Sequence, residues 1–182
     1  RYFYPQLDKE GLIIDDRANG GGNVSPMILE RLSREPYRLT MRRGSARIGT
    51  VPDAVQVGPK VCLINKYSAS DGDLFPWGFR ALGLGKLIGT RTWGGIVGIS
   101  GSLPYMDGTD IRVPFFTSYD PKTGSWIIEN HGVDPDILID NDPVKEWNGE
   151  DQQLDRAIQE VMKELQNRKP LPGVPAPRDF SK

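Results

Sequence analysis

The chain has 182 residues, of which 37% are hydrophobic and 26% charged, and its formal net charge is −1. This length and composition are typical of one ordinary globular domain with a sizeable core. The near-neutral charge argues against nucleic acid or an anionic membrane surface as a partner. No apolar run approaches the roughly 20 residues that a membrane-spanning helix needs, so we expect no membrane span.

The N-terminus and the cysteine content bear on the cellular location. The first residues, RYFYPQLDKEG, lack the basic start and apolar middle of a signal peptide, and no initiator methionine precedes them. We therefore expect a fragment or a processed piece of a protein. The single cysteine, Cys62, lies in an apolar strand pattern and has no internal partner for a disulfide. It fits a reducing compartment, so the sequence slightly favours a cytoplasmic over a periplasmic location.

The first half of the chain alternates between predicted strands and helices. GLIIDDR (residues 11–17) is a compact apolar run typical of a buried strand, and the glycine-rich ANGGGN follows it. SPMILERLSRE (25–35) begins with a serine N-cap and a proline, which predicts a helix. YRLTMRR (37–43) predicts a strand that leads into a Gly/Pro-rich loop ending at residue 60.

The alternation continues through the middle of the chain. KVCLINKYS (60–68) has the continuous apolar character of a parallel strand covered on both faces. A helix is predicted for DGDLFPWGFRALG (71–83), an extended segment for KLIGTRT (86–92) and a glycine-rich loop for WGGIVGISGS (93–102). DIRVPFFTSY and GSWIIENHG are predicted to pair as two strands around a DPKTG turn.

The C-terminal part contains the clearest helix. DPDILIDND (134–142) is predicted to be a polar turn, and NGEDQQLDRAIQEVMKELQNR (148–168) a helix. The apolar stripe of that helix is formed by Leu154, Ile158, Val161 and Leu165. We expect one domain over residues 1–167 and a Pro-rich extended tail over 168–182. The alternation of strands and helices predicts the α/β class with a largely parallel sheet.

Two strand ends carry the features that point to chemistry. The glycines after the first strand offer backbone N–H groups that no side chain covers, and Ser70 stands where the second strand breaks into a helix. Ends of parallel strands meet at one edge of the sheet, where active sites gather. Attack by a serine on a carbonyl needs two N–H donors for the oxyanion, each worth about 3 to 4 kcal/mol. Asp71 and a glycine of the turn offer such a pair.

Plainer interpretations of both features stay open. A serine before Asp-Gly at a helix start is most often an N-cap, and a glycine cluster after a strand is usually a tight turn. A phosphate-binding loop is less favoured, because GGGNVS has neither the lysine of a P-loop nor the spacing of a dinucleotide fingerprint.

Four ordered motifs, GLIIDDRANGGG, SASDGD, GKLIGTRTWGG and ENHGVDPDI, resemble the C-terminal processing (tail-specific) serine peptidases, and among them the tricorn branch. The resemblance covers residues 11–142. It implies a fold like that of the Clp protease and crotonase families, a largely parallel sheet with flanking helices. It also implies Ser70 as nucleophile, with the Asp71 amide and the amide of Gly21 or Gly22 as the oxyanion hole.

The general base of that mechanism is absent from its lysine-dyad position. Members with a serine–lysine dyad carry the base in a T-F-G-K-G motif, whereas this chain has Gly95 at the lysine position. Lys86 lies in a predicted strand start and is expected to be a solvated charge. The resemblance to the tricorn branch implies a serine–histidine pair upstream of this chain, with Glu129 as the residue that orients it. His131, two residues further on, is a less favoured base.

The sequence thus predicts a serine peptidase that cleaves peptides or unfolded proteins through an acyl-enzyme and needs no cofactor or metal. The resemblance implies a homo-oligomer with further domains upstream in the same polypeptide. Two alternatives stay open: a crotonase-type acyl-thioester enzyme, and an inactive domain that binds peptides or serves assembly. The arginines of residues 38–47 are expected on a solvated hairpin, with docking to an acidic neighbour as the second interpretation.

Overall fold

The computed structural model of the chain describes residues 2–45, 47–100, 104–177 and 179. Its centre is a four-stranded sheet in the order β1-β4-β5-β8, and all neighbouring strands run parallel. The strands are β1 (Leu12–Asp15), β4 (Lys60–Ile64), β5 (Lys86–Gly89) and β8 (Ile137–Leu138). The predicted α/β class with a largely parallel sheet is confirmed.

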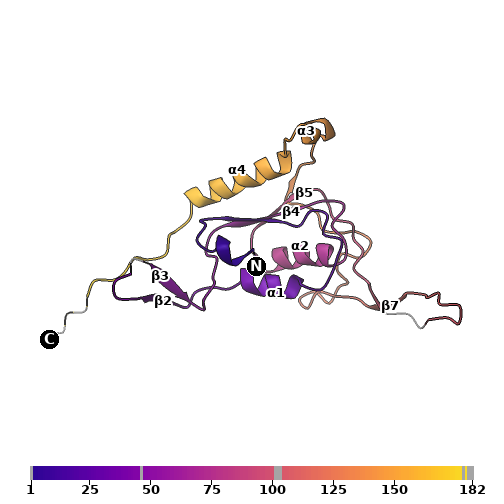
Figure 1. Cartoon of the computed structure of the whole chain (residues 1–182), viewed down its shortest axis with the longest axis horizontal. Helices are drawn as coiled ribbons and strands as arrows, with labels where there is room; N and C mark the ends of the chain where they lie inside the picture. Colours follow the sequence, from indigo (N-terminus) through magenta and orange to yellow (C-terminus); the bar gives the residue numbers. More distant parts are fainter. Residues whose placement is uncertain (1, 46, 101–103, 178, 180–182) are drawn as a thin grey trace.

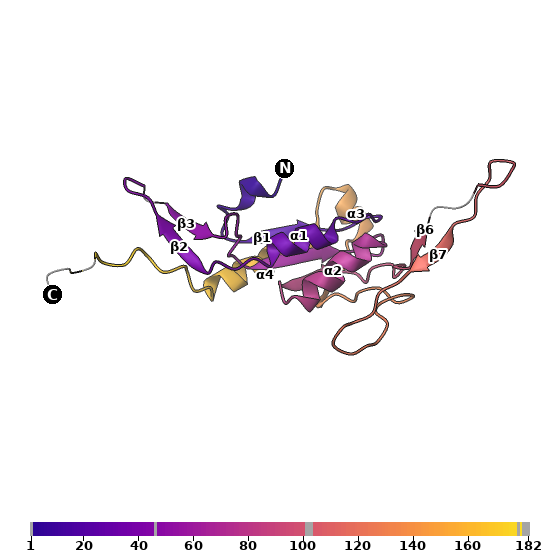
Figure 2. The same cartoon turned by 90° about the horizontal axis from the view of Figure 1, so that it is seen from below.

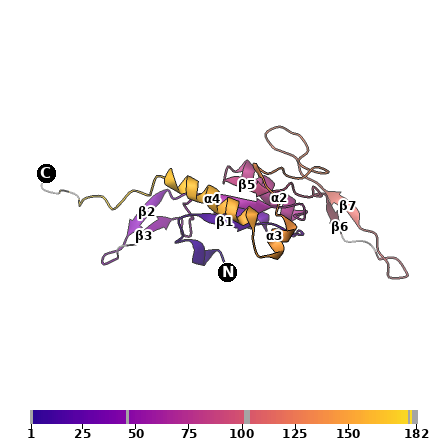
Figure 3. The ribbon, with the colours of Figure 1, turned by 90° about the horizontal axis from the view of Figure 1, so that it is seen from above.

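Helices cover both faces of this sheet (Figures 1 and 3). The helices are α1 (Ser25–Leu32), α2 (Asp71–Ala81), α3 (Pro143–Trp147) and α4 (Gln152–Gln166), and a 3-10 turn, η1, spans Tyr4–Gln6. Side chains of β4 alternate between the faces, so Cys62 and Ile64 share a core with Phe79 of α2, whereas Val61 packs with Ala157 of α4. None of the helices in the described residues is long and apolar enough to cross a membrane.

Two antiparallel hairpins project from opposite ends of the molecule (Figure 2). One consists of β2 (Arg38–Met41) and β3 (Ile48–Val51), and the other of β6 (Gly98–Ser100) and β7 (Val113–Phe116). The predicted basic hairpin is confirmed, and the four arginines Arg38, Arg42, Arg43 and Arg47 are exposed on it. Its second strand lies in the segment predicted to be a loop up to residue 60.

Three further strand predictions are wrong. The glycine-rich segment 93–102 contains β6, and β7 pairs with β6 and not with residues 124–132, where a single bridge joins Tyr119 and Trp126. Gly98 permits the close approach of the Phe116 ring in this pair, because a Cβ there would lie 2.1 Å from the ring. The predicted polar turn 134–142 contains β8, which extends the parallel sheet.

The C-terminal helix differs from its prediction in length and orientation. α4 is shorter than 148–168, and its apolar stripe is only partly inward, since Leu154 and Ile158 are 36% and 45% exposed. The helix instead buries Glu160, because Lys86 of β5 and Arg156 of α4 both pair with its carboxylate. Lys86 keeps 43% of its side chain exposed, as the sequence predicts, but it is also the ion-pair partner of the buried Glu160.

Candidate active site

The glycine turn after β1 and the start of α2 lie against each other through Asn19. Its carbonyl oxygen accepts the Ala69 N–H at 2.8 Å, and its Oδ1 accepts the Gly21 N–H at 3.1 Å. Gly72 permits this approach, since a Cβ there would lie only 2.1 Å from the Asn19 carbonyl oxygen. The structure thus brings together the two strand ends that the sequence singles out.

Ser70 immediately precedes α2, and its backbone has a positive φ, which residues other than glycine rarely adopt. Its φ is 56° and its ψ is −114°, and such a conformation stores about 1–3 kcal/mol of strain. Gly21 faces it directly: a Cβ on Gly21 would lie 3.0 Å from the Ser70 Cβ and 3.3 Å from its Oγ. The surroundings therefore hold the Ser70 side chain at a sharp turn against a backbone that carries no side chain.

The amides around Ser70 differ in their engagement. The Asp71 N–H has no hydrogen-bond acceptor among the described residues, as is usual for the first turn of a helix. The Gly21 N–H is taken by Asn19, whereas the Gly22 N–H has no acceptor within the described part of the chain. Of the three candidate oxyanion donors, Asp71, Gly21 and Gly22, the amides of Asp71 and Gly22 are therefore left without an acceptor in the described part of the chain.

The Asp71 side chain fixes the far end of the glycine turn. Its Oδ2 accepts the N–H groups of Val24 and Ser25 at 3.0 and 3.1 Å, and the Ser25 hydroxyl donates to the Asp71 carbonyl oxygen at 3.2 Å. Asp71 thereby caps α1 and ties it to α2. Sequence reasoning assigned Asp71 only a backbone role and missed this contact.

Two carboxylates bind four successive amides of the loop between β5 and β6. Asp73, which is fully buried, accepts the N–H groups of Gly94 (2.8 Å) and Gly95 (3.2 Å). Glu129 accepts those of Ile96 (2.6 Å) and Val97 (3.0 Å) through its Oε2. Sequence reasoning missed Asp73, although its place three residues after Ser70 is the capping-box spacing. Gly95 has no side chain that could act as a base.

Glu129 and His131 do not share a strand. They lie in a turn in which Asn130 has a φ of 61°. The exposed His131 ring pairs through Nε2 with Asp134 at 2.7 Å, and no hydrogen bond joins it to Ser70 or Glu129 among the described residues. Across all the residues that the structure describes, no group of three or more His, Cys, Asp or Glu side chains is placed to hold a metal ion.

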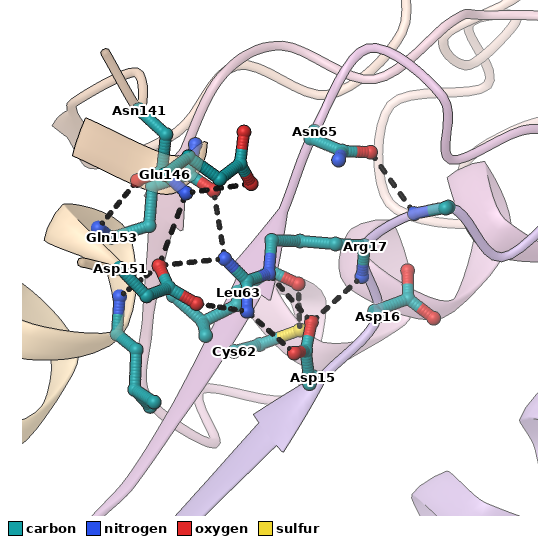
Figure 4. A network of polar contacts seen from close by, with 12 residues as sticks. Asp15, Asp16, Arg17, Cys62, Leu63, Asn65, Asn141, Glu146, Asp151 and Gln153 are labelled. Atoms are coloured by element: carbon teal, nitrogen blue, oxygen red, sulfur yellow. Dashed lines mark hydrogen bonds and ion pairs between the residues drawn. The ribbon is translucent and has the colours of Figure 1, made fainter. Parts of the chain in front are cut away.

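A polar network joins the end of β1 to the start of α4 (Figure 4). The Arg17 guanidinium donates to Asp15 and to both carboxylate oxygens of Asp151 at 2.7–2.9 Å. Asp16, beside it, is buried; its Oδ1 accepts the Asn19 side-chain N–H at 2.9 Å, and its Oδ2 has no partner within the described residues. Burial raises the pKa of Asp16 to about 7.

A parallel α/β sheet with a serine in a strained strand-to-helix turn and an adjoining glycine turn is the arrangement of a serine hydrolase. The family model described as Peptidase family S41 matches residues 3–139, so the chain belongs to this family.

Within the family the chain is tricorn-like, as the sequence predicts. It is 42% identical over 168 residues to the Tricorn protease of Thermoplasma acidophilum, covering 92% of this chain and 15% of that protein. It is 39% identical over 153 residues to Tricorn protease homolog 1 of Streptomyces coelicolor, covering 84% and 14%.

Solved structures with the same fold include a tricorn protease and a putative peptidase. The crystal structure of the tricorn protease matches with a TM-score of 0.80 at 42% identity, over 87% of this chain and 15% of that chain. A putative peptidase from Parabacteroides merdae has the same fold, with a TM-score of 0.63 at 23% identity over 84% of this chain and 52% of that one. The chain spans about 15% of the length of the tricorn proteases it matches.

Proposed function

We propose that the protein containing this chain is a serine peptidase with Ser70 as its nucleophile. The observation that carries the proposal is the strained turn at Ser70 with Gly21 packed directly against its side chain. Backbone strain of this kind persists only where the surrounding structure enforces it, and it is concentrated at functional sites. Membership of Peptidase family S41 supports the same role.

The free amides supply the oxyanion hole of the proposed reaction. The Ser70 Oγ attacks the peptide carbonyl carbon as its proton passes to the base, and the carbonyl oxygen becomes negative. The N–H groups of Asp71 and Gly22 donate to that oxygen, and the positive end of α2 adds to its stabilisation. The base then returns the proton to the leaving amine, the C–N bond breaks, and water releases the acid from Ser70.

The base itself is assigned to a histidine upstream of this chain. His131 is turned towards Asp134, and Gly95 replaces the lysine of the dyad enzymes. Glu129 is suited to orient an upstream serine–histidine pair, because its Oε2 is held by two amides while its Oε1 has no partner among the described residues. This assignment makes Ser70, Asp71, Gly22 and Glu129 the catalytic contribution of the chain, with Gly21 providing space.

The proposed substrates are peptides or unfolded proteins. The proposed partners are the upstream domains of the same polypeptide and further copies of it, because the chain matches only about 15% of the tricorn proteases.

Labelling of the full-length protein with a fluorophosphonate probe, mapped by mass spectrometry, tests the assignment. We expect an adduct on Ser70, loss of peptide hydrolysis in S70A, and both retained in H131A. An adduct on Ser70 argues against a crotonase-type enzyme, which needs no serine nucleophile. A fully active S70A, or a wild-type protein without an adduct on Ser70, overturns the proposal, and loss of activity in H131A overturns the upstream base.

A further inference from the structure

We infer that Asp73 is a positioning residue that holds the nucleophile and the Gly94–Val97 loop in one fixed arrangement. The inference rests on the proposed function of Ser70. Its basis is the set of three backbone N–H groups that converge on one fully buried carboxylate, from two segments more than 20 residues apart.

The first of the three bonds acts on the nucleophile itself. The Ser70 N–H donates to Asp73 Oδ2 at 2.9 Å. At a φ of 56° the Ser70 backbone is strained, so a contact is needed to keep this peptide in place. Asp73 supplies that contact from within the same helical turn, and the Ser70 carbonyl oxygen accepts the Asp73 N–H at 2.9 Å in return.

The other two bonds act on the loop that Glu129 also holds. Gly94 donates to Oδ1 and Gly95 to Oδ2 of Asp73. The next two amides donate to Glu129, and the Asn130 N–H donates to the Gly94 carbonyl oxygen at 2.7 Å. A continuous path of hydrogen bonds thus leads from Ser70 through Asp73 and the loop to Glu129. Through this path Asp73 sets the separation between the nucleophile and the residue that orients its base.

The chemistry of three donors on one side chain requires a carboxylate. Only acceptor atoms face these N–H groups in an ionised aspartate. In D73N the amide group has one oxygen, so its NH₂ must face either Gly94 or the pair Ser70 and Gly95. In either orientation the side-chain NH₂ faces at least one of these backbone N–H groups in a buried place. The two donors repel each other, and the start of α2 and the Gly94–Val97 loop move apart. Misplacement of reacting groups by about 1 Å lowers catalysis by about 100-fold.

The test compares the wild type, D73N, D73E and D142N as full-length proteins. Asp142 is the matched control, because its carboxylate also accepts two backbone N–H groups, but at the start of α3 and not from Ser70 or the Gly94–Val97 loop. Peptide hydrolysis gives kcat and KM, probe labelling gives the rate at Ser70, and thermal unfolding is followed beside them. We expect kcat and the labelling rate of D73N to fall about 10- to 100-fold with KM little changed. D142N should stay within about threefold, and D73E, which restores both acceptor oxygens, should recover most of the loss.

The outcomes separate this inference from the proposed function. If Ser70 is labelled and S70A is inactive while D73N matches the wild type in kcat, the positioning role alone is wrong. A D73N protein whose KM rises while kcat stays constant also contradicts it. If D73N does not fold, hydrogen exchange of the wild-type protein still tests the inference. We expect slow exchange of the Gly94 and Gly95 amides, because both donate to Asp73. Exchange as fast as in an exposed loop would show that Asp73 does not hold this loop.

Discussion

Replacement of Gly21 by alanine tests the contact on which the candidate site depends. The φ of Gly21 is 124°, a value that residues with a Cβ avoid, and the new methyl group would lie 3.0 Å from the Ser70 Cβ. Holding alanine in such a conformation requires about 1–3 kcal/mol. The turn relieves that strain by moving away from Ser70, which displaces the Gly22 amide, the proposed oxyanion donor.

The magnitude follows from the population of the strained arrangement. If the competent turn is disfavoured by about 1–3 kcal/mol, its population falls roughly 5- to 150-fold, since 1.4 kcal/mol corresponds to a factor of ten. The rate of fluorophosphonate labelling at Ser70 and kcat/KM for a peptide should both fall by that factor in G21A. The reaction is measured on the full-length protein, at a temperature where circular dichroism shows it folded.

Gly20 provides the matched control one residue away. Its φ lies outside the left-handed region, and a Cβ there meets nothing within 4 Å. We expect G20A to stay within about threefold of the wild type, because neither strain nor a collision opposes it. Equal labelling rates in G20A and G21A would refute the argument that Gly21 supplies the space beside the Ser70 side chain.

Three further predictions concern stability, measured by urea unfolding. In the folded state the pKa of Asp16 is raised to about 7. The wild type should therefore lose stability relative to D16N as the pH rises from about 4 to 7, by at most about 4 kcal/mol. A difference in stability that does not change with pH contradicts this prediction. The pH dependence is opposite for Asp151, because Arg17 lowers the pKa of its carboxyl group to about 2. The wild type should be more stable than D151N above pH 4, and this difference in stability should shrink as the pH falls towards 2. A difference that does not change with pH would contradict the prediction. G72A should unfold about 1–3 kcal/mol more easily, because its methyl group would press on the Asn19 carbonyl oxygen; wild-type stability would show that the turns can separate freely.

The parts of the fold that the sequence predicts are those specified by neighbouring residues. The apolar run of β4, the proline at the start of α1 and the amphipathic pattern of α4 each act over a few positions. β6, and the pairing of β7 with it, escape prediction because that pairing depends on contacts between distant residues. Gly98 gains its partner only when the Phe116 ring lies over it.

The same distinction explains α4 and the candidate site. Glu160 looks like a solvent-facing residue in the helical pattern, and it is buried because Lys86 supplies its charge partner from 74 residues away. Ser70 and the glycine turn carry local signals, a helix start and three consecutive glycines. The bonds from Gly94 to Asp73 and from Ile96 to Glu129 join residues 21 and 33 positions apart, and no local pattern announces them.

The acidic first turn of α2 poses an electrostatic problem for the proposed oxyanion hole at the same place. Asp71 and Asp73 put two carboxylates beside the amides that stabilise negative charge in the proposed reaction, which alone would disfavour that reaction. Asp73 is balanced by three N–H groups and Asp71 by two, all from the backbone. Because these N–H dipoles already compensate the negative charge of Asp73, we expect loss of its carboxylate to disturb the position of Ser70 more than it relieves repulsion of the oxyanion. The sign of the change in kcat in D73N therefore decides between the two effects, and an increase would mean that repulsion dominates.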